Sequence, residues 1–501
     1  MMNARRLASL YRRLPASVRA LSLASAVALA GCMSLAPPYQ QPALPVPATF
    51  PGATGNGAGA SAAETGWHDY FADPELRELI TTALDNNRDL RLAMQRVEEA
   101  RALYGIRRAD QLPTLGVEAD LARQRVPADV SGVGRAVTAS QYTVGVGIAT
   151  WELDFWGRVA NLREAALQNY LASDAAREAV QLTLIEQVAN TYLALRELDE
   201  RLALTHETIA SREQSYRIFS RRYQVGAISK LDLTQVETLW RQALALGTEL
   251  EQAREQQANG LQLLVGAPVD VPPAAAKLDD NAVMRDLPAG LPSDLLTNRP
   301  DIVAAEYQLR AANANIGSAR AEFFPRITLT GAFGTASTQL SGLFSGPNKM
   351  WSFGPSVSLP IFDRGRRSAN LAAVTSQRDQ AITSYEQAIQ SAFRDVADAL
   401  ARRGTIDAQV TADRNNVEHS LDNYRLTDAR YKGGIDTFLD SLIAQRSLYG
   451  AQRAYVATEL TKATNLVDLY TALGGDATLD ATADGPRPTA PEPEGSPIPQ
   501  P

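Results

Sequence analysis

Two stretches of this 501-residue sequence align without gaps: Leu90–Pro113 (LRLAMQRVEEARALYGIRRADQLP) and Ile302–Pro325 (IVAAEYQLRAANANIGSARAEFFP), 212 residues apart. Small and apolar residues coincide along both stretches, and both end in proline. Further along the chain the separation becomes 208 residues, and Gly157-Arg158 matches Gly365-Arg366. Matching residues at fixed separations indicate an internal repeat. The chain is therefore predicted to contain two copies of one structural unit.

Each copy is predicted to begin with a helix followed by two strands. In the first copy, apolar residues recur at helical spacing from Pro74 to Gln111, and Pro113 ends the pattern. Apolar residues then alternate with others, which is the period of a strand. The alternating runs are Leu115–Leu121 and Tyr142–Ile148 in the first copy, and Ile327–Phe333 and Phe353–Ile361 in the second. Runs of about ten residues with aromatic residues near their ends are typical of tilted transmembrane strands.

A very long helix is predicted after each pair of strands. Arg158–Tyr223 contains neither proline nor glycine, and its apolar residues step by threes and fours. At 1.5 Å per residue, such a helix would be about 100 Å long. A rod of that length cannot fold into a compact globule, so it is expected to pack along its length against other helices, as in a coiled coil.

A tight turn then reverses the chain in each copy. Gly226 suits the left-handed residue just after a helix end, and Ser229 suits the first cap of the return helix, which is predicted to reach about Leu264. In the second copy the turn contains Gly433 and Gly434, and its return helix is predicted to reach about Leu473.

The N-terminus is typical of a bacterial lipoprotein signal peptide. Five arginines precede a ten-residue apolar run, Leu21–Ala30, which is too short to span a bilayer as a helix. The run ends in Leu29-Ala30-Gly31-Cys32, which resembles a lipobox, and Cys32 is the only cysteine in the chain. We therefore predict lipidation, including palmitate, at Cys32. Met33 is not the aspartate that retains many lipoproteins at the inner membrane, which favours the outer membrane.

Composition argues against nucleic-acid binding and against enzymatic chemistry. Without the five signal arginines, 44 basic residues face 56 acidic ones, a net charge of −12, whereas phosphate binding requires a positive surface. The three histidines, His68, His206 and His419, lie far apart and have no partner at metal-ligand spacing. No phosphate-binding loop or nucleophile elbow occurs. We expect no cofactor, no metal and no catalytic residue.

These patterns divide the chain into six segments. They are a lipoprotein signal peptide (1–31), a lipidated N-terminal linker (32–66), repeat 1 (67–265), an inter-repeat linker (266–292), repeat 2 (293–474) and a disordered proline-rich tail (475–501). Repeats 1 and 2 each consist of a helix, two strands and a long helical hairpin.

Four strands per chain cannot close a barrel, and an open sheet in lipid would leave backbone groups unsatisfied. The membrane interpretation therefore requires oligomerisation. Two chains would give eight strands around a bore filled by side chains, whereas three would give twelve strands and room for a channel.

Four short motifs resemble one known family. They are Trp151–Arg158 (WELDFWGR), Asn298–Ile302 (NRPDI), Phe323–Pro325 (FFP) and Ser358–Asp363 (SLPIFD). Each is similar to a signature of the efflux outer-membrane lipoproteins related to TolC and OprM, and the resemblance extends from about Trp67 to Leu473. It implies a mixed α and β membrane protein, a homotrimer with one 12-stranded outer-membrane β-barrel. The barrel continues into a long periplasmic α-helical barrel of coiled-coil hairpins.

The same resemblance implies function and partners. Family members are passive exit ducts in the outer membrane of Gram-negative bacteria, held in outer-membrane lipid. They receive drugs, metals or other solutes from an inner-membrane RND-type transporter through a periplasmic membrane-fusion adaptor. Two alternatives remain at this stage. One is a duct for type I protein secretion, and the other is a lipid-anchored periplasmic coiled-coil scaffold without a pore.

The tips of the helical hairpins are the candidate channel gate. Asp232 and Asp440 occupy equivalent positions of the two repeats, and the resemblance implies that Asp440 lines the closed periplasmic end. Three Asp440 carboxylates around a threefold axis would favour cations. The family often has a second aspartate three residues later, but this chain has Ile443 there. The alternative is structural: Ser229-x-x-Asp232 and Thr437-x-x-Asp440 both fit a capping box.

Four further residues before the turns are candidates for the same gate. Arg222 and Arg430 would bridge to acids of neighbouring hairpins, although a cation in the last turn of a helix is favoured by the helix dipole in any case. Tyr223 and Tyr431 would line the constriction or, alternatively, pack within the tip.

Overall fold

The computed structural model describes residues 34–51, 62, 65–273, 287, 294–475, 479–482 and 485–488. The predicted signal peptide and Cys32 lie outside the described residues, as do most of the inter-repeat linker and most of the C-terminal tail. Two short strands, β5 (Leu479–Thr482) and β6 (Gly485–Pro488), lie within the segment predicted to be a disordered tail. The chain packs as two compact units, and each is described separately.

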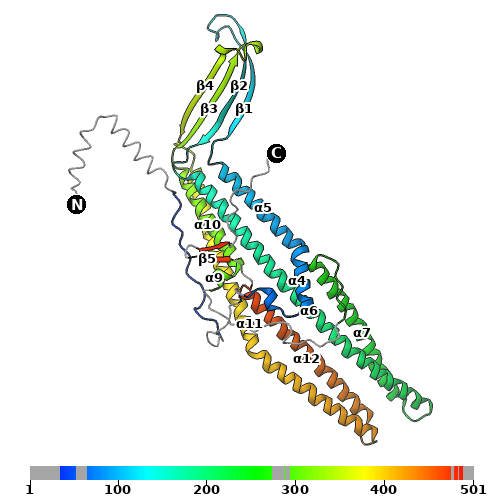
Figure 1. The fold of residues 1–501 in the computed structure, drawn as a ribbon. Coiled ribbons are helices and arrows are strands. Elements are labelled where there is room, and N and C mark those ends of the chain that lie inside the picture. The colour runs from blue at the N-terminus through cyan, green and yellow to red at the C-terminus, as the bar shows by residue number, and fades with distance from the viewer. Residues whose placement is uncertain are drawn as a thin grey trace, which may run out of the picture. The chain divides into compact units, whose positions relative to one another are not determined.

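The first unit comprises Met1–Pro42, Glu98–Ala172 and Glu306–Ser384, and it contains one antiparallel sheet. Its strands are β1 (Leu115–Val126), β2 (Val137–Glu152), β3 (Arg326–Ser337) and β4 (Lys349–Ser358), paired in that order. Figure 1 shows the four strands side by side, with β1 and β4 at the two edges. Strand β2 belongs to repeat 1 and β3 to repeat 2, so their pairing joins the strands of both repeats in one sheet.

All four predicted alternating runs lie in strands, but the bounds differ: β1, β2 and β3 are longer than predicted, and β4 begins and ends earlier. Large apolar side chains on the sheet are exposed, including Val117, Phe333, Trp351 and Phe353. The second strand of repeat 2 was predicted to reach Ile361, but β4 ends at Ser358. Pro360 explains the earlier end, because proline cannot donate a ladder hydrogen bond and restricts the residue before it.

The long helices form as predicted. Helix α6 covers Arg158–Gln224 and α11 covers Arg366–Lys432, each with 67 residues. Helices α5 (Arg88–Ala109) and α10 (Pro300–Ala321) precede the strands of the two repeats. Each of these four helices has residues in both units. None of the helices in the described part of the chain is both long and apolar enough to cross a membrane.

The second unit contains the two helical hairpins and several short helices. The return helices are α7 (Lys230–Val265) and α12 (Phe438–Ala472), which Figure 1 shows alongside α6 and α11. The short helices are α3 (Trp67–Tyr70), α4 (Pro74–Asn86) and α9 (Leu295–Asn298). The apolar positions that predicted α6 are buried here, among them Ile185, Val188, Tyr192 and Leu195. The hairpins thus bury the apolar stripe that a single long helix would expose.

The single helix predicted over 74–111 is wrong: it is divided at Asn87. There α4 ends and α5 begins, and the extended backbone of Asn87 has φ −60° and ψ 136°. Asn87 Oδ1 accepts hydrogen bonds from the amides of Asp89 (2.8 Å) and Leu90 (2.9 Å), and its Nδ2 donates to the Leu264 carbonyl (2.8 Å). A buried asparagine therefore caps α5, because its side chain satisfies amides that a helix start leaves free. Hydrophobic periodicity does not detect such a cap.

One ion pair occurs in both repeats but in opposite environments. In repeat 1, Asp199 pairs with Arg254 (2.5 Å) and Arg196 (3.3 Å), and its side chain is 2% exposed. The two arginines also donate to the carbonyls of Val271 (2.8 Å) and Pro272 (3.0 Å), which cover the pair. The equivalent pair in repeat 2, 208 residues later, is Lys462–Asp407 at 3.1 Å.

These two pairs provide a prediction with an internal control. Asp199→Ala removes the buried carboxylate of Arg254, whereas Arg196 keeps its ion pair with Glu75. The buried guanidinium of Arg254 left behind should destabilise the second unit by about 3–5 kcal/mol. Asp407 is 77% exposed, so Asp407→Ala should cost only about 0–1 kcal/mol. Thermal unfolding of the detergent-solubilised protein, followed by far-ultraviolet circular dichroism, compares the two variants directly. Equal shifts in Tm would show that the linker does not shield Asp199.

Candidate functional site

Both hairpin turns have the same hydrogen-bonded geometry. In repeat 1, Gly226 has φ 72° and Ala227 donates to the Arg222 carbonyl at 2.8 Å. In repeat 2, Gly434 has φ 75° and Ile435 donates to the Arg430 carbonyl at 2.9 Å. These are Schellman motifs, in which glycine accepts the left-handed conformation that ends a helix. Gly433, in contrast, precedes the left-handed residue and has no positive φ.

Asp232 and Asp440 both form capping boxes. The Ser229 hydroxyl accepts from the Asp232 amide (3.2 Å), and Asp232 Oδ2 accepts from the Ser229 amide (3.1 Å). In repeat 2 the corresponding distances between Thr437 and Asp440 are 3.4 and 3.1 Å. Each carboxylate therefore satisfies amides at the start of its own return helix, as the structural alternative predicts. Asp440 also remains exposed at the tip.

The two arginines before the turns have different partners. Arg222 Nη1 donates to the Tyr431 hydroxyl at 3.0 Å and so links hairpin 1 to hairpin 2 of the same chain. Arg430 forms a two-pronged ion pair with Asp436 of its own turn, at 2.6 and 2.8 Å. Hydrogen bonding to this guanidinium holds the pKa of Asp436 below its usual value. Among the described residues of one chain, neither arginine pairs with an acid of the other hairpin.

An apolar cluster at the tips holds the two hairpins together. Phe219 of α6, Val236 of α7 and Leu442 of α12 are buried against one another. Phe438 adds its ring, 4.1 Å from the Phe219 ring centroid. Tyr431 packs against this cluster, whereas Tyr223 is 39% exposed. The two equivalent tyrosines therefore differ: Tyr431 is half-buried in the tip packing, whereas Tyr223 is exposed.

A groove of about 360 Å³ runs between the two return helices beside this cluster. Its floor contains Leu239, Leu442 and Ile443, and its rim includes Thr234, Thr238 and Gln242. Ile443 is 47% exposed. The groove thus has an apolar floor, and its lining adds uncharged polar residues of α7 and one cation of α12, Arg446.

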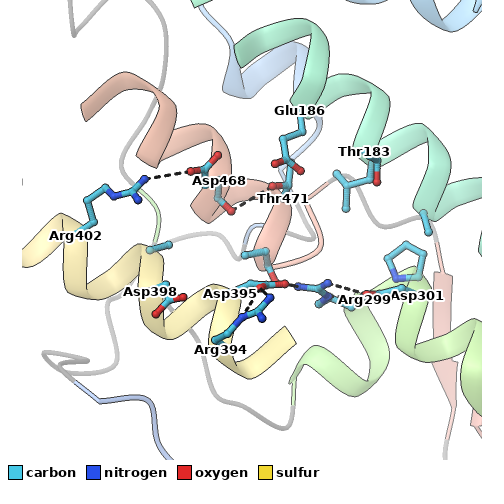
Figure 2. A pocket seen from close by; sticks show the side chains of 15 residues that line it. Thr183, Glu186, Arg299, Asp301, Arg394, Asp395, Asp398, Arg402, Asp468 and Thr471 are labelled. Carbon is cyan, nitrogen blue, oxygen red and sulfur yellow. Dashed lines mark hydrogen bonds and ion pairs between the residues drawn. The ribbon is translucent and has the colours of Figure 1, made fainter. Parts of the chain in front are cut away.

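A second cavity, of about 460 Å³, lies among charged residues of α6, α11, α12 and the start of α10 (Figure 2). Arg299 is its central cation. It donates to both carboxylate oxygens of Asp301 (3.0 and 2.7 Å), to Asp395 (3.4 Å) and to the Ala472 carbonyl (3.3 Å). The Asn298–Ile302 motif therefore ties the start of α10 to α11 and to the end of α12. Among the described residues, no group of three or more acidic, histidine or cysteine side chains could hold a metal.

Two carboxyl groups in this cavity have raised pKa values. Burial raises the pKa of Glu186, and the nearby Asp468 carboxylate raises it further. Burial also raises the pKa of Asp468, although Asn190 donates to it at 3.2 Å and Arg402 lies 3.5 Å away. Sequence reasoning missed both residues, because Glu186 and Asp468 are far apart in the chain. The only local signal was an acid within the apolar pattern of α6.

The raised pKa values predict a pH dependence of stability. A carboxyl whose pKa is higher in the folded state stabilises that state below its unfolded pKa, and the effect is lost as pH rises through the folded value. At pH 7.5, Glu186→Gln should therefore raise Tm, and the rise of Tm on acidification should become smaller. Exposed Glu207, on the same helix, gives the control Glu207→Gln, which should change neither quantity. A lower Tm for Glu186→Gln at pH 7.5 would contradict this account.

Comparison with known proteins identifies the family. A model of the outer membrane efflux proteins matches residues 79–267 and again 291–475, which confirms the duplication. Outer membrane protein OprJ of Pseudomonas aeruginosa is 43% identical over 89% of this chain and 93% of its own length. The antibiotic efflux pump outer membrane protein ArpC of Pseudomonas putida is 42% identical, over 91% of this chain and 95% of its own.

Solved structures agree with these matches. The open state of the Neisseria gonorrhoeae MtrE outer membrane channel superposes with a TM-score of 0.81 at 40% identity, covering 89% of this chain and 99% of MtrE. A membrane protein from Pseudomonas aeruginosa gives a TM-score of 0.84 at 42% identity, with 88% and 100% coverage. The chain therefore belongs to the outer membrane efflux protein family, and it is an outer-membrane efflux channel, not an enzyme.

Proposed function

We propose that three copies of this chain form the exit duct of a tripartite pump that expels antibiotics or organic solvents. The observation that carries the proposal is the open sheet: β1 and β4 each pair on one side only within the described chain. Strand edges in lipid cost several kcal/mol for each unsatisfied group, so a neighbouring chain must cover them. Three such sheets supply twelve strands, enough for a barrel with an aqueous bore.

The substrate class rests on relatives whose names state what they export. ArpC is an antibiotic efflux pump protein, and SrpC of Pseudomonas putida, 42% identical, is a solvent efflux pump protein. A passive duct receives its solutes from a pump. We therefore assign to this channel an inner-membrane RND-type transporter and a periplasmic membrane-fusion adaptor. Neither the secretion duct nor the scaffold without a pore is favoured by any feature of the chain.

The groove between α7 and α12 is the proposed contact for the adaptor. An amphipathic helix binds such a groove by placing apolar side chains on its floor while its polar flanks meet the rim. The rim residues Thr234, Thr238 and Gln242 carry no charge, and Arg446 is the one cation in the lining. An adaptor helix that places an acid opposite Arg446 would therefore avoid burying an unpaired ion.

The resting closure is assigned to the hairpin tips. Asp440 is exposed while its Oδ2 caps α12, and threefold symmetry would bring three such carboxylates together. A ring of this kind attracts cations and repels anions in a narrow pore. Arg222, bonded to Tyr431, would hold the two hairpins of each chain in the closed arrangement. Opening would then require this bond and the apolar tip cluster to rearrange.

Single-channel conductance in planar bilayers tests the duct and its gate. Wild-type trimers should give small, cation-selective currents at neutral pH, because the tips are closed. Asp440→Ala should increase the open-pore current severalfold and reduce cation selectivity. The matched control is Asp232→Ala, which removes the equivalent cap, worth about 1 kcal/mol of helix stability, from the other hairpin.

Three outcomes distinguish the possibilities. A larger current in Asp440→Ala than in Asp232→Ala assigns the gate to Asp440. Equal changes in both variants would reduce Asp440 to a helix cap. Folded trimers that never conduct, even after Arg222→Ala and Asp440→Ala are combined, would refute the gated duct.

A further inference from the structure

A short N-terminal strap, Ser34–Tyr39, is held along α10 in the first unit. The Leu35 carbonyl accepts from Arg320 Nη1 (3.1 Å), and the Pro37 carbonyl accepts from Asn313 Nδ2 (2.8 Å). The Tyr39 hydroxyl donates to Glu306 (3.0 Å). The strap therefore runs antiparallel to the helix, with its first residues beside the end that leads into β3.

Both ends of the strap are fixed by side chains that are themselves held. Arg310 forms an ion pair with Glu306 at 2.7 Å and stacks on the Tyr39 ring, 4.6 Å from its centroid. At the other end, the Ser34 hydroxyl donates to Asn161 Oδ1 (2.8 Å). With the strap in place, Asn161 and Glu306 are 4% and 2% exposed, so the strap binds polar groups that it helps to bury.

The duplication shows that this docking surface is specific to one repeat. The positions of α5 equivalent to Glu306, Arg310 and Asn313 are Met94, Glu98 and Arg101, which cannot make the same contacts. Glycine is present in both copies, at Gly105 and Gly317. A Cβ at Gly105 would meet no atom within 4 Å, whereas a Cβ at Gly317 would lie 2.7 Å from the Ala36 amide nitrogen and 2.6 Å from Asn161 Nδ2. Only in repeat 2 does the glycine make room for the strap.

We propose that the strap is a fixed spacer that holds the lipid on Cys32 beside the foot of the sheet. This inference rests on the proposed lipidation of Cys32, which lies outside the described residues. Ser34 is two positions after Cys32, so the lipid is at most about 7 Å of chain away from the docked strap. Arg320, which binds Leu35, is six residues before the first residue of β3. A lipid on Cys32 would therefore enter the bilayer close to the strands.

The physical benefit of the strap is a high effective concentration of the sheet at the membrane. Phe50, stacked on Phe393 at 5.1 Å, lies eighteen residues after Cys32. Releasing the strap as far as Phe50 would lengthen the tether from two residues to eighteen. Effective concentration falls at least as the −3/2 power of tether length, so membrane insertion should become roughly tenfold less efficient or worse.

The experiment compares repeat-matched variants of the full-length chain expressed in cells. Gly317→Ala should displace the strap, and Gly105→Ala is its control. Asn313→Ala removes a strap bond without a steric clash, and Arg101→Ala is its control. Amide hydrogen exchange of residues 34–39 in purified protein should be about tenfold faster in Gly317→Ala and Asn313→Ala, and unchanged in the controls. The second measurement is the amount of detergent-resistant trimer in outer-membrane fractions.

The same variants in a Cys32→Ser background separate the strap from the lipid. We expect Gly317→Ala, which displaces the strap, to lower the amount of trimer roughly tenfold with Cys32 present, and Asn313→Ala, which removes one of several strap contacts, to lower it less. Neither variant should add a further loss to Cys32→Ser. Equal losses in both backgrounds, or no loss in either, would overturn the spacer role. Incorporation of labelled palmitate is followed in parallel. A wild-type chain that takes up no palmitate would overturn the lipid anchor itself, which is a distinct failure.

Discussion

The constraint on which this structure depends is that a helix of 67 residues cannot bury its own apolar stripe. Helices α6 and α11 each have that length. In each repeat the chain must therefore turn back so that a second helix covers the apolar stripe. The return depends on two local devices at each tip, a left-handed glycine that ends one helix and a capping box that starts the next. The hairpins then meet in the apolar tip cluster, where Phe219 and Phe438 pack across the two repeats.

Because the chain is duplicated, each position of one repeat can be compared with the equivalent position of the other. Positions that keep both residue and geometry, such as the capping boxes of Asp232 and Asp440, show what every hairpin needs. Positions that keep the residue but change its surroundings, such as Asp199 and Asp407, show where another segment covers only one repeat. Gly105 and Gly317 differ in the same way, because the N-terminal strap lies only on α10. Part of the asymmetry between the repeats is thus created by segments outside them.

The sequence predicted the features that depend on local periodicity and local chemistry. Strands, long helices, turn glycines and capping pairs all follow from residues within a few positions of one another. The division of the first helix at Asn87 was missed, because a buried side-chain cap leaves the hydrophobic pattern unchanged. The cavity acids Glu186 and Asp468, and the partner of Arg222, were also missed. These depend on which distant segments pack together, and alternation or helical spacing in one segment contains no such information.

The geometry of Asp440 explains how one carboxylate can serve both stability and gating. Its Oδ2 forms the hydrogen bonds to the Thr437 amide and hydroxyl, and no described residue donates to Oδ1. Capping therefore uses one oxygen and leaves the other facing solvent. A carboxylate held in this way is fixed in position at little entropic cost, because the helix start has already ordered its side chain. One turn further along, Ile443 presents an exposed apolar surface where the family often has a second acid. On the proposed gate, a closed tip would thus combine a single ring of charge with apolar contact, and Asp440 would be its main electrostatic barrier.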